Sequence, residues 1–209
     1  MVRVKVCGIT NLEDALASVG EGADALGFNF YRRSPRYIEP ARAREITGRL
    51  PGSVLCVGVF VNEETPAAVE RIATESGVGA VQLHGDESEE FCASLAGLRV
   101  IKALRAGEGF APERATEYYA AESILLDSFS AKARGGTGET FDWSIARRTR
   151  ELVPRLYLAG GLTSENVAAA VAAVRPFAVD VCSGVESAAG RKDHARLRSF
   201  VAALRGAAQ

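Results

Sequence analysis

Eight short apolar runs alternate with amphipathic or polar segments along the chain, and this alternation restricts the fold more than any other feature. The runs have the length of buried strands, and most of the segments between them carry apolar residues at helical spacing. Strands separated by helices lie parallel in one sheet, and eight such units favour closure into a barrel. The expected strands are 2–6, 25–30, 54–61, 79–83, 99–104, 123–126, 156–159 and 177–181.

The alternation runs through all 209 residues without a linker or a break in composition. We therefore predict an α/β protein made of one (β/α)8 TIM barrel domain, residues 1–209. No GxGxxG motif follows the first strand, which argues against a dinucleotide-binding sheet. The fifth unit is the weakest, because Gly107, Gly109 and Pro112 interrupt it. A short or irregular fifth helix is expected there.

Several helix starts carry capping signals. Thr10 with Glu13 has the spacing of a capping box, and Thr65 precedes a proline at the first helical position. Later helices are expected to be capped by Asp86, by Asp142, and by Thr163 or Ser164.

The segment 155–187 contains two strands, the helix between them and a glycine turn after each strand. The helix should bury Val167, Ala170, Val171 and Val174, which share one face. In a (β/α)8 barrel the loops after strands seven and eight commonly bind phosphate, because backbone N–H groups can approach an anion there. The residues expected to contribute are Gly160, Gly161, Ser183 and Gly184, with Gly136, Thr137 and Gly138 in a glycine-rich loop after the sixth strand.

Composition excludes several classes of function. The formal net charge is −1 with no basic block, so nucleic acid is not an expected partner. No apolar run is long enough to cross a bilayer, and the first ten residues lack a signal-peptide pattern. The cysteines are Cys7, Cys56, Cys92 and Cys182, widely spaced and without a CxxC motif. Reduced thiols in a cytoplasmic protein without membrane contact are therefore expected.

Four polar residues follow expected strands and should meet at the carboxyl-terminal mouth of the barrel: Cys7, Arg36, His84 and Asp127. Each also has a purely structural interpretation. Cys7 could be a core thiol and Arg36 a solvated loop charge, while His84 could be a hydrogen-bonded structural histidine and Asp127 a loop cap. A metal site from His84, Asp86 and His194 matches no ligand spacing. Strand parity turns Lys5 and Cys7 inward and the valines outward. Asp180 interrupts an apolar run, so we predict a buried pair with Lys5.

The chain resembles the phosphoribosylanthranilate isomerase family of tryptophan biosynthesis over its whole length. Any one matching stretch is weak, but the ordered set is highly specific. The stretches are VKVCGIT at 4–10, SPRYI at 34–38, VGVFVN at 57–62, VQLHGDE at 81–87, LLDS at 125–128, GGTGETFDW at 135–143, LAGGLTSENV at 158–167, DVCSGVE at 180–186 and KDHARLRSF at 192–200. Cys182 departs from the serine usual in the family, and we expect it to affect packing more than phosphate binding.

The resemblance implies an Amadori rearrangement of N-(5-phosphoribosyl)anthranilate to 1-(2-carboxyphenylamino)-1-deoxyribulose 5-phosphate by general acid–base catalysis. It implies Cys7 as the base, Asp127 as the acid and Arg36 as the partner of the anthranilate carboxylate. His84, which we also expect at the mouth, is a further candidate for substrate binding. The partner is then a phosphorylated small molecule. No cofactor and no metal are implied, and the protein is expected to be a monomer or a homodimer.

Two alternatives remain open from the sequence. One is the histidine-pathway isomerase that performs the same reaction type on a similar barrel, although that family has aspartate at the position of Cys7. The other is a non-catalytic barrel that binds a phosphosugar. A free thiol has a pKa of about 8.5 and is mostly protonated at neutral pH. A base role therefore requires a neighbour that lowers the pKa, and Lys5 and the start of the first helix are the candidates.

Overall fold

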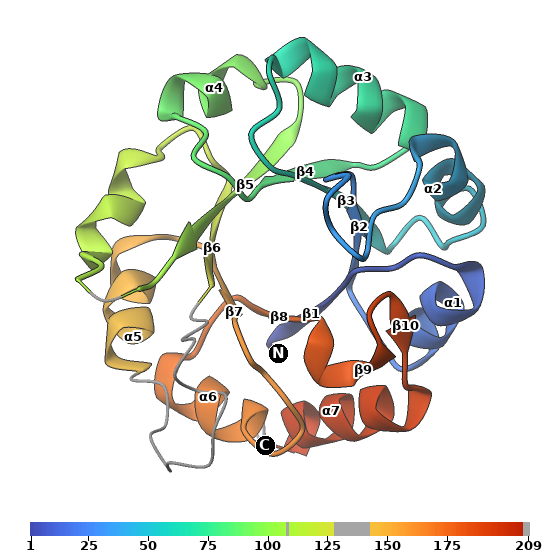
Figure 1. Cartoon of the computed structure of the whole chain (residues 1–209). Coiled ribbons are helices and arrows are strands. Elements are labelled where there is room, and N and C mark those ends of the chain that lie inside the picture. The colour runs from blue at the N-terminus through green and yellow to red at the C-terminus, as the bar shows by residue number, and fades with distance from the viewer. Residues whose placement is uncertain (108, 128–142, 207–209) are drawn as a thin grey trace.

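The computed structural model describes residues 1–107, 109–127 and 143–206, which form a closed barrel of eight parallel strands in sequential order. Figure 1 looks along the barrel, with the strands in the centre and the helices around them. The predicted parallel barrel is confirmed. The strands are β1 Arg3–Cys7, β2 Ala25–Asn29, β3 Leu55–Phe60, β4 Ala80–Leu83, β5 Arg99–Arg105, β6 Ser123–Asp127, β7 Leu156–Ala159 and β8 Ala178–Val181.

A helix follows each barrel strand in the described part of the chain, and in every unit except the fifth it is an α-helix. The fifth unit contains a 3-10 helix, η1 Pro112–Glu117, as its glycines and proline predicted. The α-helices are α1 Leu12–Gly20, α2 Pro40–Thr47, α3 Pro66–Ser76, α4 Glu89–Ser94, α5 Trp143–Leu152, α6 Val167–Val174 and α7 His194–Gly206. None of these described helices has the length and apolar character needed to cross a bilayer.

The predicted caps of α1 and α4 were wrong by one or two residues. Asn11 caps α1, its side chain accepting from the Asp14 N–H at 2.8 Å, because the Thr10 hydroxyl donates to the Gly190 carbonyl instead. Ser88 rather than Asp86 caps α4. Thr65 caps α3 as predicted, accepting from Ala68.

The start of α6 also differs from the prediction, whereas its buried face does not. Asn166 is the N-cap residue, and Thr163 instead accepts from the Glu165 N–H within the preceding turn. Val167, Ala170, Val171 and Val174 are buried. The predicted cap Asp142 lies outside the described residues.

The core has two layers, because alternate strand residues face opposite sides. The outer layer packs strand residues such as Val4 and Val6 against the helices, and the inner layer fills the barrel with residues such as Val57 and Leu125. Lys5 points inward, fully buried, and its Nζ lies 2.7 Å from Asp180 Oδ1 on the neighbouring strand. The predicted buried pair is confirmed, and it spans the β1–β8 junction that closes the barrel.

A small antiparallel hairpin between β8 and α7 was not predicted. Its strands are β9 Glu186–Ala188 and β10 Arg191–Lys192. Strands of two or three residues are too short to show an alternating pattern. Figure 1 shows the hairpin beside β1 and α1, inside the ring of helices.

Candidate active site

A cavity of about 250 Å³ opens at the carboxyl-terminal ends of the barrel strands. It contains every nominated site residue that the structure describes. These are Cys7, Arg36, His84, Asp127, Gly160, Gly161, Ser183 and Gly184. The other three nominated residues, Gly136, Thr137 and Gly138, lie outside the described residues. Segments far apart in the sequence meet here because parallel strands end on the same side of the barrel.

Cys7 ends β1 and points into this cavity, above Lys5 on the same face of the strand. Its pKa lies well below the usual thiol value. The hydrogen bond from Cys182 lowers it most, and the charges of Lys5, Lys192 and His84 add to this, against the opposing effect of burial. Lys5 was one of the two groups expected to act in this way, but it is not the largest influence.

Cys182 follows β8 directly and lines the same cavity. Its Sγ donates to Glu186 Oε1 at 3.8 Å, and the contact with Cys7 together with burial raises its pKa far above the usual value. The sequence-based view of Cys182 as a packing residue omitted this contact with the nominated base.

Asp127 stands at the end of β6, on a different part of the cavity wall from Cys7. His84 Nε2 lies 3.5 Å from Asp127 Oδ2. Gln82 Nε2 contacts His84 Nδ1 at 2.8 Å, and with the amide donating, Nδ1 accepts and the ring N–H at Nε2 faces Asp127. His84 therefore has two polar neighbours, as the structural interpretation expects, and it also lines the cavity, as the binding interpretation expects.

Arg36 is not a solvated loop charge. Its Nε and Nη2 donate to both carboxylate oxygens of Glu186, at 2.9 and 2.6 Å. Nη1 makes no hydrogen bond within the described part of the chain, so the guanidinium retains a donor edge for a ligand. The Arg36 side chain crosses Gly8, where a Cβ would lie 2.6 Å from Arg36 Cδ and where the backbone φ is +78°. Only glycine suits that conformation and that close approach.

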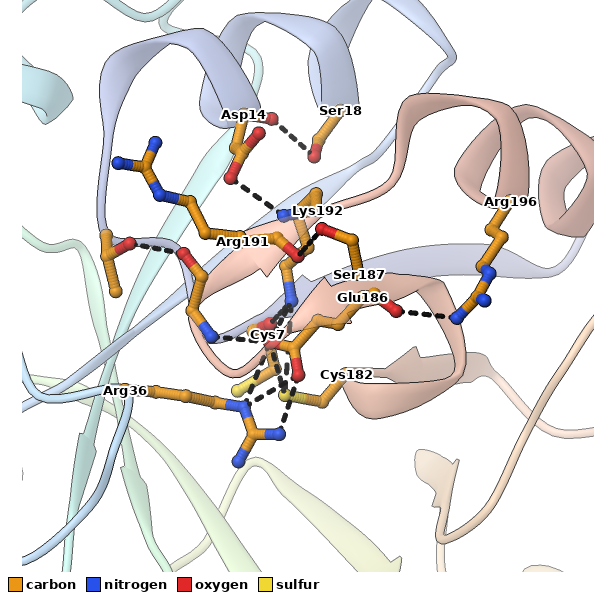
Figure 2. A network of polar contacts seen from close by, with 12 residues as sticks. Cys7, Asp14, Ser18, Arg36, Cys182, Glu186, Ser187, Arg191, Lys192 and Arg196 are labelled. Atoms are coloured by element: carbon orange, nitrogen blue, oxygen red, sulfur yellow. Dashed lines mark hydrogen bonds and ion pairs between the residues drawn. The ribbon is translucent and has the colours of Figure 1, made fainter.

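Glu186 and Lys192, both in the β9–β10 hairpin, are polar residues at the site that the sequence analysis missed. Lys192 Nζ donates to Glu186 Oε1 at 2.9 Å and to the Cys7 carbonyl oxygen at 2.6 Å. Figure 2 shows these groups converging on Cys7, Arg36 and Cys182. Both residues fall within stretches that match the family, and this match was the only feature of the sequence that could have pointed to them.

The two glycine turns after β7 and β8 lie against each other on the cavity wall. A Cβ at Gly184 would collide with the carbonyl oxygen of Leu162, so only glycine allows this packing. The expected turn at Ser183 is a single 3-10 turn, η3 Ser183–Val185. The paired turns present backbone to the cavity, as an anion site in this position requires.

The residues of the alternative metal site do not come together. His194 Nε2 lies 2.9 Å from Asp14 Oδ1, a polar contact between α7 and α1, whereas His84 lines the cavity. Among the residues that the structure describes, no group of three or more His, Cys, Asp or Glu side chains is arranged to hold a metal.

Comparison with known proteins points to one family. Residues 4–203 match the family model described as "N-(5'phosphoribosyl)anthranilate (PRA) isomerase". The N-(5'-phosphoribosyl)anthranilate isomerase of Thermotoga neapolitana is 51% identical over 207 residues, which cover 99% of this chain and 100% of that protein.

Solved structures of the same kind superpose closely. The phosphoribosyl anthranilate isomerase of Thermotoga maritima is 50% identical with a TM-score of 0.91, covering 99% of this chain and 100% of that one. A structure of a phosphoribosyl anthranilate isomerase in complex with reduced 1-(o-carboxyphenylamino)-1-deoxyribulose 5-phosphate is 49% identical with a TM-score of 0.88, at the same coverage.

Proposed function

The chain belongs to the N-(5'-phosphoribosyl)anthranilate isomerase family, and we propose that Cys7 and Asp127 are the base and the acid of its reaction. The chain is an isomerase of tryptophan biosynthesis, and it converts N-(5'-phosphoribosyl)anthranilate to 1-(2-carboxyphenylamino)-1-deoxyribulose 5-phosphate. The observation that carries the assignment of roles is the shared cavity, which is lined by the Cys7 thiol of lowered pKa and, from a different strand, by the Asp127 carboxyl.

Asp127 acts first, as the general acid. It protonates the ring oxygen of the ribose, so that the furanose opens and the anthranilate nitrogen forms an iminium with C1. His84, whose Nε2 lies 3.5 Å from Asp127 Oδ2, supports this role by keeping the carboxyl oriented.

Cys7 acts second, as the general base. Its thiolate takes the proton from C2, and the electron pair of that C–H bond forms the C1–C2 double bond while the iminium π electrons move to nitrogen. The resulting enolamine tautomerises to the C2 ketone, which is the product. A thiol of lowered pKa carries a larger fraction of thiolate at neutral pH and is therefore better able to accept this proton.

The substrate spans the mouth of the cavity. Its phosphate binds the glycine turns at Gly160, Gly161, Ser183 and Gly184, with Gly136, Thr137 and Gly138 joining them. Its anthranilate carboxylate pairs with the guanidinium of Arg36, where the planar fork suits a carboxylate. The geometry that supports this is that Arg36 and the turns line the same cavity.

The test follows loss of phosphoribosylanthranilate fluorescence on adding the protein, with Cys7→Ser and Asp127→Asn as variants. Each should lower kcat by ~10²–10⁴ while affinity for a phosphorylated product analogue stays within a few-fold. Cys56→Ser, at a buried thiol outside the cavity, is the matched control and should keep its activity. Wild-type kcat in Cys7→Ser would return Cys7 to a structural role, and wild-type kcat in Asp127→Asn would do the same for Asp127.

Three broader features complete the proposal. The chain works as one (β/α)8 domain over residues 1–209, in the cytoplasm, and as a monomer or a homodimer. The eight-stranded barrel, which closes on itself through β1 and β8, supports the single domain. Sedimentation equilibrium of the purified chain distinguishes the two assembly states.

A further inference from the structure

One buried carboxylate at the site serves two cations. The Glu186 side chain is 4% exposed, and its oxygens accept from Arg36 Nη2 at 2.6 Å and from Lys192 Nζ at 2.9 Å. Gly190 N–H adds a third donor at 3.2 Å. Glu186 therefore fixes the guanidinium and the ammonium relative to each other, as Figure 2 shows.

The three charged groups leave one unit of positive charge. Arg36 and Lys192 carry one each, and Glu186 removes one. This excess lies beside Cys7, because Lys192 Nζ donates to the Cys7 carbonyl oxygen at 2.6 Å and lies 4.0 Å from Cys182 Sγ. Ionisation of the Cys7 thiol neutralises the cluster, so the cluster favours the thiolate.

We propose that Glu186 and Lys192 are positioning residues for the isomerisation, Glu186 orienting Arg36 towards the substrate carboxylate and Lys192 stabilising the Cys7 thiolate. The inference rests on the roles of Cys7 and Arg36 proposed above. The hairpin β9–β10 then has a function, since it carries both residues and links the base to the carboxylate-binding guanidinium.

Lys192 is a cation near Cys7 whose charge is only partly neutralised. Lys5 has its own carboxylate, Asp180, at 2.7 Å, so this pair contributes little net charge. Lys192 shares its carboxylate with Arg36. The titratable groups that face Cys7 or line the cavity with it are Lys5, Arg36, His84, Asp127, Asp180, Cys182, Glu186 and Lys192.

Two substitutions that remove opposite charges should move the pH profile in opposite directions. The acid limb of the profile is the pH range over which kcat/KM rises as the base ionises. Lys192→Gln keeps a hydrogen-bond donor but removes a positive charge, so the acid limb should move to higher pH by about one unit. Glu186→Gln keeps the shape but raises the cluster by one positive charge, so the limb should move down. Glu186→Gln should also raise KM about tenfold, because Arg36 loses its fixed orientation.

Arg196→Met is the matched control. Arg196 Nη1 donates to the main-chain oxygen of Glu186 at 2.7 Å, so its loss loosens the same hairpin without touching Cys7 or Arg36. Its acid limb should stay at the wild-type pH. Lys192→Arg restores the charge and should restore the limb. If Lys192→Gln does not fold, K192M replaces it.

The rate of Cys7 alkylation by iodoacetamide, followed by mass spectrometry of the Cys7 peptide, gives the same shifts without turnover. Opposite shifts in both the alkylation and the kcat/KM profiles support the inference. Opposite alkylation shifts with a kcat/KM profile that ignores them overturn Cys7 as the base but keep the positioning of its thiol. The inference is overturned if the acid limbs of Lys192→Gln and Glu186→Gln stay at the wild-type pH or move in the same direction. It is also overturned if Glu186→Gln leaves KM unchanged.

Discussion

At the residue scale, the chemistry depends on where the proton of two adjacent thiols resides. The hydrogen bond from Cys182 is the largest influence that lowers the pKa of Cys7, and the same contact and burial raise the pKa of Cys182. Cys56 and Cys92, which lie outside the cavity, have pKa values raised by burial to about 11. Cys7 is therefore the only one of the four described thiols with a lowered pKa, and we expect it to be the most reactive.

Removing the Cys182 thiol should change the pH dependence of the rate. Below the pKa of Cys7 the base is protonated and inactive, so kcat/KM rises with pH through that value. Cys182→Ala removes the donor to the thiolate, which raises the pKa of Cys7 and moves the acid limb up by about one pH unit. Rates well above the limb should match the wild type.

Cys182→Ser is the control, because its hydroxyl can still donate. Its acid limb should lie below that of Cys182→Ala. Coincident pH profiles for the wild type and Cys182→Ala would show that the contact does not set the pKa.

Arg36→Met should weaken binding of the anthranilate half. The substitution removes a charge-assisted contact with the carboxylate, which is worth about 1.5–3 kcal/mol. Calorimetry with a carboxylated product analogue measures the loss, and a decarboxylated analogue is the internal control. Equal affinities of wild type and variant for the carboxylated analogue would exclude this role.

At the scale of elements, the site depends on two turns that belong to different strand–helix units. The turn after β7 and the turn after β8 touch at Leu162 and Gly184, where no side chain fits. The N-terminus of α6 follows the first of these turns. Displacing one turn therefore displaces the backbone that we propose binds the phosphate.

Gly184→Ala should damage phosphate binding more than stability. The added Cβ collides with the Leu162 carbonyl, so the turns must separate and their N–H groups lose alignment. We expect KM to rise at least tenfold, in keeping with the sensitivity of catalysis to displacements of about 1 Å.

Gly97→Ala, where an added Cβ meets nothing within 4 Å, is the matched control and should leave KM unchanged. Inhibition by inorganic phosphate gives a second measurement. An unchanged phosphate inhibition constant in Gly184→Ala would contradict the assignment of the turns.

At the scale of the whole molecule, the barrel closes between the first strand and the last. Lys5 and Asp180 pair across this β1–β8 junction, 175 positions apart. Burial is the largest single influence on the pKa of Lys5 and lowers it, yet the attractions and hydrogen bonds of Asp180 and Cys7 together outweigh burial and raise this pKa. Burial raises the pKa of Asp180 to about 6. The pair thus places two ionisable side chains at a junction whose other buried strand residues are apolar.

Lys5→Met should destabilise the barrel by about 3–5 kcal/mol, because it leaves a buried carboxylate without its partner. The loss should be greater at pH 8 than at pH 5. Without Lys5 the folded-state pKa of Asp180 rises further above its unfolded value, so folding then favours the protonated carboxyl, which low pH supplies.

Urea unfolding at the two pH values measures the effect, and the double variant Lys5→Met with Asp180→Asn should be more stable than Lys5→Met at pH 8. A loss below about 1 kcal/mol that does not vary with pH would show that the junction does not depend on the pair.

The sequence by itself determined the barrel and the inward direction of its strand residues. Apolar periodicity involves residues that are only a few positions apart, so it can be recognised in the sequence alone. It specifies each strand, each buried helix face and the alternation that turns Lys5 and Cys7 inward. The lone carboxyl at Asp180 in an apolar run even indicated its partner, because a buried charge requires one.

Only the tertiary structure decided which groups surround Cys7 and Arg36. Thr10 lost its capping role because a carbonyl at Gly190, 180 positions away, accepts from its hydroxyl. Glu186 and Lys192 reach the site through a hairpin too short to leave a periodic signal, and Cys182 meets Cys7 because β8 closes against β1. These contacts depend on chain closure over more than 140 positions, and no local pattern encodes them.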